Sequence, residues 1–185
     1  MFLKKYQQKA LDILKDYLRE LERVGSKYAF MGITNQPYNS DFFGEVPFIC
    51  VKIPTGGGKT LVGCHAVSEI MGTVLKHKME RGIIMWFVPS EAIKTQTLKK
   101  FKDRNDWHRK VLDEAFQNNI RIFSNEEALR IRKEDVEDNL CVIVSSLDAF
   151  RKEKALQNKY KVYQENGALL SHFENIQEND SLELD

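Results

Sequence analysis

Apolar residues recur every three or four positions at the start of the chain, as at Ala10 and Leu14. This spacing predicts an amphipathic helix over residues 4–24 that ends near Gly25. The segment from 34 to 47 is rich in Asn, Pro, Asp and Gly, a composition that predicts a loop. The chain is therefore expected to begin with one long helix and a loop.

Farther along the chain, short apolar runs alternate with helical patterns. Strands are predicted at residues 48–52, 83–88, 120–123 and 140–144. The runs at 83–88 and 140–144 are almost continuously apolar, which is typical of strands buried on both faces of a parallel sheet. Helices are predicted at residues 61–74, 91–102, 111–116, 126–132 and 149–176. This alternation predicts an α/β fold with an open parallel sheet and helices on both faces.

A glycine-rich segment lies between the first predicted strand and the helix that follows it, and reads Ile53-Pro54-Thr55-Gly56-Gly57-Gly58-Lys59-Thr60. Glycines let backbone N–H groups curl around phosphates, and the N-terminus of a helix adds further donors. Lys59 can reach the β- and γ-phosphates, and the Thr60 hydroxyl can ligate the Mg²⁺ that bridges them. We expect Lys59 and Thr60 to be catalytic and Thr60 to be the metal ligand. The other expected nucleotide contacts in this loop are Thr55, Gly56, Gly57 and Gly58.

The strict phosphate-loop pattern has Gly where this chain has Ile53. The loop as it stands resembles motif I of superfamily 2 helicases and translocases, in which that position varies. Val88-Pro89-Ser90 with the later Gln96 resembles motif Ia of the same enzymes, at the end of a predicted strand. Ser145-Ser146 resembles the next strand-end motif. The resemblance implies contacts with the phosphates of one nucleic-acid strand by Ser90, Gln96, Ser145 and Ser146.

Tyr6-Gln7 in the first predicted helix resembles the helicase element in which a glutamine reads the adenine edge. A glutamine amide can both donate and accept a hydrogen bond, so Gln7 could select ATP over GTP. An exposed helical glutamine is the alternative, since Gln8 stands beside it.

Hydrolysis in such enzymes also needs an Asp-Glu pair at the end of an apolar strand, where Asp holds Mg²⁺ and Glu orients the attacking water. Asp113-Glu114 follows Trp107-His108-Arg109-Lys110 rather than a strand, and it precedes the Ser145-Ser146 segment instead of following it. We therefore expect the motif to lie beyond Asp185. Alone, this chain is not expected to hydrolyse ATP at a useful rate.

Together with a Lys- and Tyr-rich segment after Phe150, these motifs resemble the restriction subunit of type III restriction-modification enzymes over nearly the whole chain. The resemblance implies a three-layer P-loop NTPase (RecA-like) lobe that is incomplete at its C-terminus. Residues 1–47 would form an adenine-side helix and loop, 48–150 the P-loop core, and 151–185 a helical insertion or tail. The implied ligands and partners are ATP, Mg²⁺, DNA and a methylation (Mod) subunit. A second lobe and usually an endonuclease domain would follow.

The composition of the chain bears on three further properties: nucleic-acid binding, metal binding and membrane contact. The net charge of +1 gives no strong global attraction to nucleic acid, although Lys and Arg gather at residues 94–110 and 151–161. Such runs are usually solvated faces. The three cysteines and four histidines show no metal-ligand spacing and are expected to be packing residues. No apolar run is long enough to span a membrane and no signal peptide is recognisable, so we expect a cytoplasmic protein without membrane contact.

Two other functions stay open. The chain could belong to another superfamily 2 helicase, acting on DNA or RNA without a nuclease. It could also be a nucleotide-binding scaffold module that does not act on DNA. Salt-sensitive binding to DNA would separate the motors from the scaffold.

Overall fold

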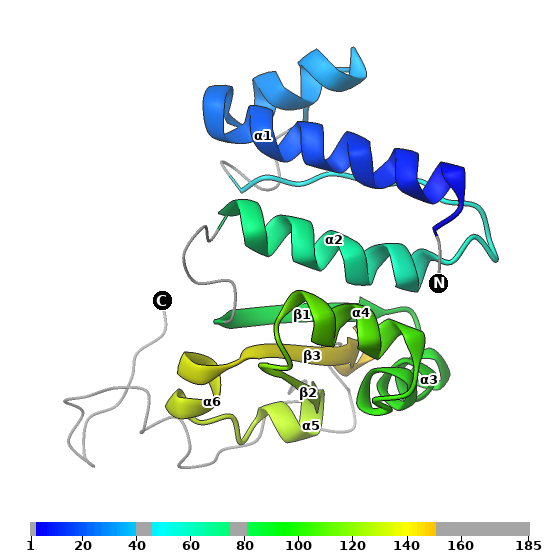
Figure 1. The fold of residues 1–185 in the computed structure, drawn as a ribbon, viewed down its shortest axis with the longest axis vertical. Coiled ribbons are helices and arrows are strands. Elements are labelled where there is room, and N and C mark those ends of the chain that lie inside the picture. The colour runs from blue at the N-terminus through cyan, green and yellow to red at the C-terminus, as the bar shows by residue number, and fades with distance from the viewer. Residues whose placement is uncertain (1–2, 40–45, 75–80, 151–185) are drawn as a thin grey trace, which may run out of the picture. The chain divides into compact units, whose positions relative to one another are not determined.

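The structure is a computed structural model that describes residues 3–39, 46–74 and 81–150. It is a mixed α/β fold with an open parallel sheet of three strands (Figure 1). The chain divides into two compact units. The first comprises Met1–Met79 and Lys110–Ala115, and the second comprises Glu80–Arg109 and Phe116–Asp185.

Two helices, α1 (Lys5–Thr34) and α2 (Lys59–Val74), dominate the first unit. The prediction that the first helix ends near Gly25 is confirmed in part: regular helical geometry stops there at a kink, and a second helical segment, included in α1, continues to Thr34. Gly25 has φ 81° and ψ 166°, a conformation that a residue without Cβ adopts readily. Helix α1 then ends at Asn35, which has φ 53° and whose N–H donates to the Met31 carbonyl.

The apolar face of α1 is buried against α2 and the segment before the glycine loop. Leu11, Leu14 and Leu18 are each less than 5 % exposed and pack in one cluster with Val62 and Ile53. Full burial of one such side chain contributes about 1.5–3 kcal/mol. This core holds the first helix beside the glycine loop.

The predicted strand at residues 48–52 was wrong, since the structure assigns no strand to any described residue before Gly82. A strand needs a neighbouring strand to pair its N–H and C=O groups, and the described residues offer none to this segment. Ile49 and Ile53 pack instead against the α1 core. The Phe48 ring lies 5.1 Å from the Tyr38 ring.

The second unit contains the sheet, whose strands are β1 (Gly82–Val88), β2 (Ile120–Ser124) and β3 (Leu140–Ser146). Figure 1 shows β3 between the other two, and both pairings are parallel. Val88 pairs with Ser146 in the β1–β3 register. The carboxyl ends of these strands therefore lie at the same edge of the sheet.

Burial differs between β1 and β3, the two strands that were predicted from almost continuous apolar runs. Every residue of β3 is buried, as its apolar sequence predicted. In β1 the residues alternate, and Ile83, Met85 and Phe87 are 52 %, 43 % and 48 % exposed. The prediction of burial on both faces is thus confirmed for β3 and wrong for β1, because β1 is an edge strand of the described sheet and one of its faces is only partly covered.

The helices of the second unit differ from the prediction mainly after β2. Helix α3 spans Glu91–Lys102 as predicted and contacts all three strands. The helix predicted at 126–132 is replaced by two short helices, α5 (Asn125–Ala128) and α6 (Lys133–Asp138). Ser124 is the N-cap that starts α5: its hydroxyl accepts from the Glu127 N–H, and its own N–H donates to the Glu127 carboxylate. The helix ends after Ala128, where the Arg130 and Ile131 N–H groups donate to carbonyls three residues back.

Two further elements complete the described part of the chain. Helix α4 (Trp107–Ala115) starts earlier than predicted. A short 3₁₀ helix, η1 (Leu147–Phe150), follows β3. The helix predicted at 149–176 lies almost wholly outside the described residues. Among the helices that are described, none combines the length and the apolar character needed to cross a membrane.

Candidate functional site

The glycine loop has the backbone geometry of a phosphate cradle. Gly56 and Gly58 have φ of +74° and +77°, the left-handed region that favours glycine. Helix α2 begins immediately afterwards at Lys59, and the Val62 N–H donates to the Gly58 carbonyl at 3.1 Å. The first N–H groups of a helix have no partner within it. The loop and the start of α2 therefore present backbone donors suited to an anion.

The charged side chain of the loop is accessible but folded back. Lys59 is exposed, and its Nζ donates to the Pro54 carbonyl at 3.0 Å. The same carbonyl accepts the Gly57 N–H at 3.0 Å. An exposed amine held by a single neutral carbonyl can be released to a triphosphate, since a hydrogen bond between two charged groups is stronger.

The remaining loop residues suit the same ligand. Thr60 is half-buried at the start of α2, and Thr55 is exposed. A Cβ at Gly57 would lie 2.7 Å from the Ile53 side chain and 2.8 Å from the Pro54 carbonyl oxygen. These residues fit a triphosphate with its divalent cation: Gly56, Gly58 and Lys59 would hold phosphates, and the Thr60 hydroxyl would ligate Mg²⁺. The predicted contact from Gly57 would first require its N–H to leave the Pro54 carbonyl.

The first helix reaches the same loop. Gln7 is 4 % exposed, and its Nε2 donates to the Gly57 carbonyl at 2.8 Å. The Tyr6 hydroxyl donates to the same oxygen at 3.0 Å. The Lys4 N–H donates to Gln7 Oε1 at 2.8 Å. The alternative that Gln7 is an exposed helical residue is wrong; that description fits Gln8, which is exposed and whose amide donates to Asp12.

The predicted nucleic-acid residues at the end of β1 are accessible. Ser90 occupies the N-cap position of α3, with φ −147° and ψ 162°, but its hydroxyl makes no capping hydrogen bond. Gln96 is exposed on α3. Ser90, which is half-buried, is thus available to a ligand at the start of α3, and Gln96 is available in its second turn.

The corresponding serines at the end of β3 are not accessible. Ser145 and Ser146 are each 0 % exposed. The Ser146 hydroxyl donates to the Glu91 carboxylate, and the Ser145 hydroxyl donates to the Ser146 carbonyl at 3.3 Å. Contact between these two hydroxyls and a phosphate would require the Glu91 contact to open.

A buried lysine connects this edge of the sheet, and no motif in the sequence indicated it. Lys94 is 7 % exposed, and its Nζ lies 2.8 Å from Glu91, 3.0 Å from Glu126 and 2.9 Å from the Asn125 amide oxygen. Burial alone would lower the pKa of Lys94, but the hydrogen bonds to the two carboxylates raise it above its ordinary value. The only hint in the sequence was the Glu91–Lys94 spacing of three residues on one helix.

The pKa values of the two carboxylates in this cluster are shifted in the opposite direction, below their ordinary values. Hydrogen bonds from Lys94 and Ser146 lower the pKa of Glu91. Burial by itself would raise the pKa of Glu126, but hydrogen bonds from Ser124, the Glu126 backbone and Lys94 lower it to about 2. The cluster is therefore fully ionised at neutral pH and joins α3 to α5 and β3.

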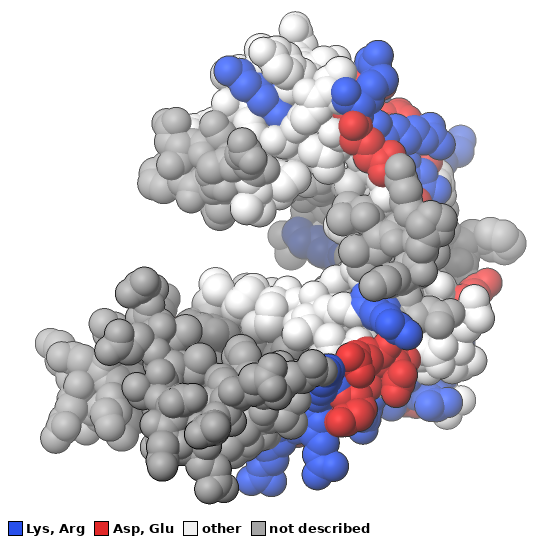
Figure 2. All heavy atoms as spheres, turned by 90° about the vertical axis from the view of Figure 1, so that its left-hand side faces the viewer, with Lys and Arg blue, Asp and Glu red and all other residues white. Residues whose placement is uncertain are grey.

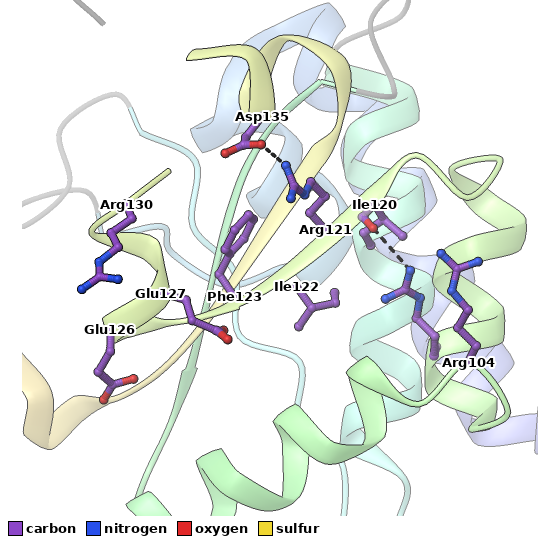
Figure 3. Close-up of a pocket in the computed structure, with 10 residues that line it drawn as sticks. Arg104, Ile120, Arg121, Ile122, Phe123, Glu126, Glu127, Arg130 and Asp135 are labelled. Atoms are coloured by element: carbon purple, nitrogen blue, oxygen red, sulfur yellow. Dashed lines mark hydrogen bonds and ion pairs between the residues drawn. The ribbon is translucent and has the colours of Figure 1, made fainter. Parts of the chain in front are cut away.

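The second unit also contains a pocket of about 820 Å³ beside β2 (Figure 3). Its three acidic side chains each form an ion pair, as Asp135 does with Arg121. Arg104 and Arg130 line the pocket as well, and Figure 3 draws no contact from either of them. The lining has a surplus of positive charge, which would suit an anion, although no sequence motif lies here.

Charge on the described surface is mixed. Figure 2 shows Lys and Arg side chains beside Asp and Glu on the face that it presents, rather than one continuous basic surface. On α1, for example, Arg19 pairs with Asp16 and Arg23 with Glu20. Of the basic residues gathered in the sequence at 94–110, Lys94 and Arg109 are buried.

Other candidate chemistry is excluded for the described residues. Asp113 and Glu114 lie within α4, so they are not an acidic pair at a strand end. No group of three or more His, Cys, Asp or Glu among the described residues could hold a metal ion. All three cysteines are free; Cys64 and Cys141 are buried, as expected for packing residues, whereas Cys50 is exposed.

Comparison with known protein families gives a match over most of the chain. Residues 1–175 match the family described as type III restriction enzyme, res subunit. No curated protein and no solved structure matches the chain. Domains of the matched family are helicase-like ATP-binding modules. Because the match covers residues 1–175 of 185, the chain belongs to the family of type III restriction enzyme res subunits.

Proposed function

We propose that this chain is the ATP-binding part of an ATP-dependent DNA translocase or helicase, as in the restriction subunit of a type III restriction enzyme. The observation that carries the proposal is the loop at residues 55–60. Two glycines in the left-handed region lead into the first turn of α2, where Lys59 is exposed. The family match supports the same assignment.

The nucleotide would be held along the first unit. Lys59 would leave the Pro54 carbonyl for the β- and γ-phosphates, and the Thr60 hydroxyl would ligate Mg²⁺. Gln7 would read adenine. Its amide has four hydrogen-bonding positions, and the contacts with Gly57 and Lys4 use one donor and one acceptor. One N–H and one acceptor site remain, which is the pair that the adenine edge requires.

One DNA strand would be held at the carboxyl end of β1. Ser90 and Gln96 are the direct contacts in this proposal, because both are accessible. Ser145 and Ser146 would contribute only if the Glu91 contact opened. Phosphate contacts of this kind bind without reading sequence, so a methylation (Mod) subunit would supply recognition of the DNA site.

Residues 1–185 would bind ATP without hydrolysing it efficiently. The Asp-Glu pair that such sites use to hold Mg²⁺ and orient water has no counterpart at a described strand end, since Asp113 and Glu114 are helical. A complete protein containing this chain would be an ATP-dependent hydrolase, and in a restriction enzyme also an endodeoxyribonuclease.

The test is nucleotide binding by the purified chain with Mg²⁺, measured by calorimetry for the wild type and Lys59→Ala. Loss of the lysine is expected to weaken ATP binding by about tenfold or more, equivalent to about 1.4 kcal/mol. ATP turnover is expected to stay at background in both proteins. Robust turnover that Lys59→Ala abolishes would contradict the proposed lack of hydrolysis, and no ATP binding at all would contradict the nucleotide site.

Fluorescence anisotropy with single-stranded and duplex DNA tests the motor assignment. Binding that weakens steeply as salt rises is expected for phosphate contacts. A complete protein that binds nucleotide but shows no salt-sensitive DNA binding would instead be a scaffold module.

A further inference from the structure

Two side chains from the first helix converge on one carbonyl of the glycine loop. The Gln7 amide and the Tyr6 hydroxyl both donate to the Gly57 oxygen, at 2.8 and 3.0 Å. These residues are separated from Gly57 by 50 and 51 positions in the sequence. Both contacts are made to the loop backbone itself.

The donor from Gln7 is fixed in place. Its Oε1 accepts the Lys4 N–H at 2.8 Å, so both ends of the amide are held. A Cβ at Gly58 would lie 2.6 Å from Gln7 Nε2, which is shorter than the distance that a real Cβ keeps from a neighbouring heavy atom. Glycine at this position allows the Gln7 amide to lie directly against the loop.

The anchored carbonyl determines where the next donor points. A trans peptide is planar, and its C=O and N–H point in opposite directions. Holding the Gly57 oxygen toward Tyr6 and Gln7 therefore turns the Gly58 N–H away from α1. The Gly58 N–H belongs to the set of loop donors that would bind the phosphates.

We propose that Tyr6 and Gln7 are positioning residues for the phosphate loop: their hydrogen bonds to the Gly57 carbonyl aim the Gly58 N–H at the phosphates. The first helix thereby controls triphosphate binding itself, in addition to any reading of the base. This inference rests on the proposed nucleotide site and adds to it. A residue that only read adenine would have no effect on a ligand without a base.

Inorganic tripolyphosphate is the probe that separates these roles, since it carries the phosphates and no base. Its affinity and that of ATP would be measured with Mg²⁺ on the full chain. The variants are Gln7→Ala, Tyr6→Phe and, as a matched control, Gln8→Ala. Gln8 is the neighbouring glutamine, which is exposed and whose amide donates to Asp12 on the same helix.

Gln7→Ala is expected to weaken tripolyphosphate binding about tenfold, because the buried Gly57 oxygen loses its closer donor, and to weaken ATP binding by at least as much. Tyr6 is 42 % exposed, and Tyr6→Phe keeps its ring. The substitution is expected to weaken the binding of both ligands by a similar factor of about three. Gln8→Ala is expected to bind both ligands like the wild type.

A folding defect is separated from a positioning defect by the Gly58 backbone amide resonance. Tyr6→Phe is expected to keep the wild-type unfolding midpoint without ligand and yet to reduce the shift of the Gly58 amide signal when tripolyphosphate binds. If Gln7→Ala weakens ATP but leaves tripolyphosphate affinity unchanged, Gln7 is only a base reader and the inference is overturned. If the wild type binds neither ligand, the proposed nucleotide site itself fails, and this inference with it.

Discussion

Gly58 shows how much of the proposed site depends on the absence of a side chain. Gly58→Ala would place a methyl group 2.6 Å from Gln7 Nε2 at a residue whose φ is +77°. We expect tripolyphosphate affinity to fall at least about tenfold, because either the Gln7 contact or the loop conformation must give way. Calorimetric titration of the variant measures this loss.

Two other glycines serve as controls for that experiment. Gly56 has a similar φ of +74° but open space around a Cβ, so Gly56→Ala adds only conformational strain of about 1–2 kcal/mol. Gly32 lies in α1 with open space and no left-handed φ. Gly32→Ala is expected to stabilise the fold by about 0.5–1 kcal/mol without changing affinity. Equal affinity losses for Gly56→Ala and Gly58→Ala would show that the Gln7 contact is unimportant.

Single residues of the site were predictable from the sequence to different degrees. The glycines, Lys59 and Thr60 could be named because phosphate chemistry needs those residue types in that order. The Tyr6 contact could not be predicted, since it joins residues 51 positions apart and depends on the packing of α1. The burial of Ser145 and Ser146 also depends on tertiary packing, which their hydroxyl chemistry does not reveal.

Between elements, the Lys94 cluster predicts acid-sensitive stability. The folded-state pKa of Glu126 is about 2, below its ordinary value of 4.5. A lowered pKa means that folding favours the ionised carboxylate, so its stabilisation is complete above about pH 4.5 and is lost as the pH falls through about 2. The unfolding midpoint should therefore drop across this window.

Glu126→Gln isolates one carboxylate of the cluster. The variant is expected to show a smaller drop in its unfolding midpoint between about pH 4.5 and pH 2, because the glutamine does not titrate. Part of the drop should remain, since interactions with Lys94 and Ser146 also lower the pKa of Glu91. Thermal melts over this pH range measure the effect; a pH dependence identical to that of the wild type would refute the role of Glu126.

Helices and strands were predicted best where the local pattern of apolar residues alone decides their type. Helix α3 and strand β3 follow directly from their patterns. The segment at 48–52 has a strand-like composition but no described strand beside it, and pairing is a property of two segments rather than one. The helix predicted at 126–132 failed because α5 ends after Ala128, where the Arg130 and Ile131 N–H groups donate to carbonyls three residues back instead of four, a local geometry that apolar spacing does not register.

At the scale of the whole molecule, the sequence predicted an α/β fold with a parallel sheet, and the structure confirms it. The division into two compact units was not predicted. Lys110–Ala115 groups with the first unit although it is surrounded in sequence by the second. Apolar periodicity shows that a segment has a face to bury, and it does not identify which core buries it.

This division leads to a prediction about nucleotide-dependent stability. The proposed phosphate loop and the α1–α2 core both belong to the first unit. ATP at 100 times its dissociation constant stabilises the unit that binds it by about 2.7 kcal/mol. Amides of Leu11–Leu18 that exchange only when this unit unfolds should therefore exchange about 100-fold more slowly. Amides of β3 should change far less, because the sheet has its own core in the second unit. Hydrogen exchange read by mass spectrometry measures both, with Lys59→Ala as the control that lowers the protection to about tenfold or less at the same ATP concentration. Equal slowing of β3 would show that the two units unfold together.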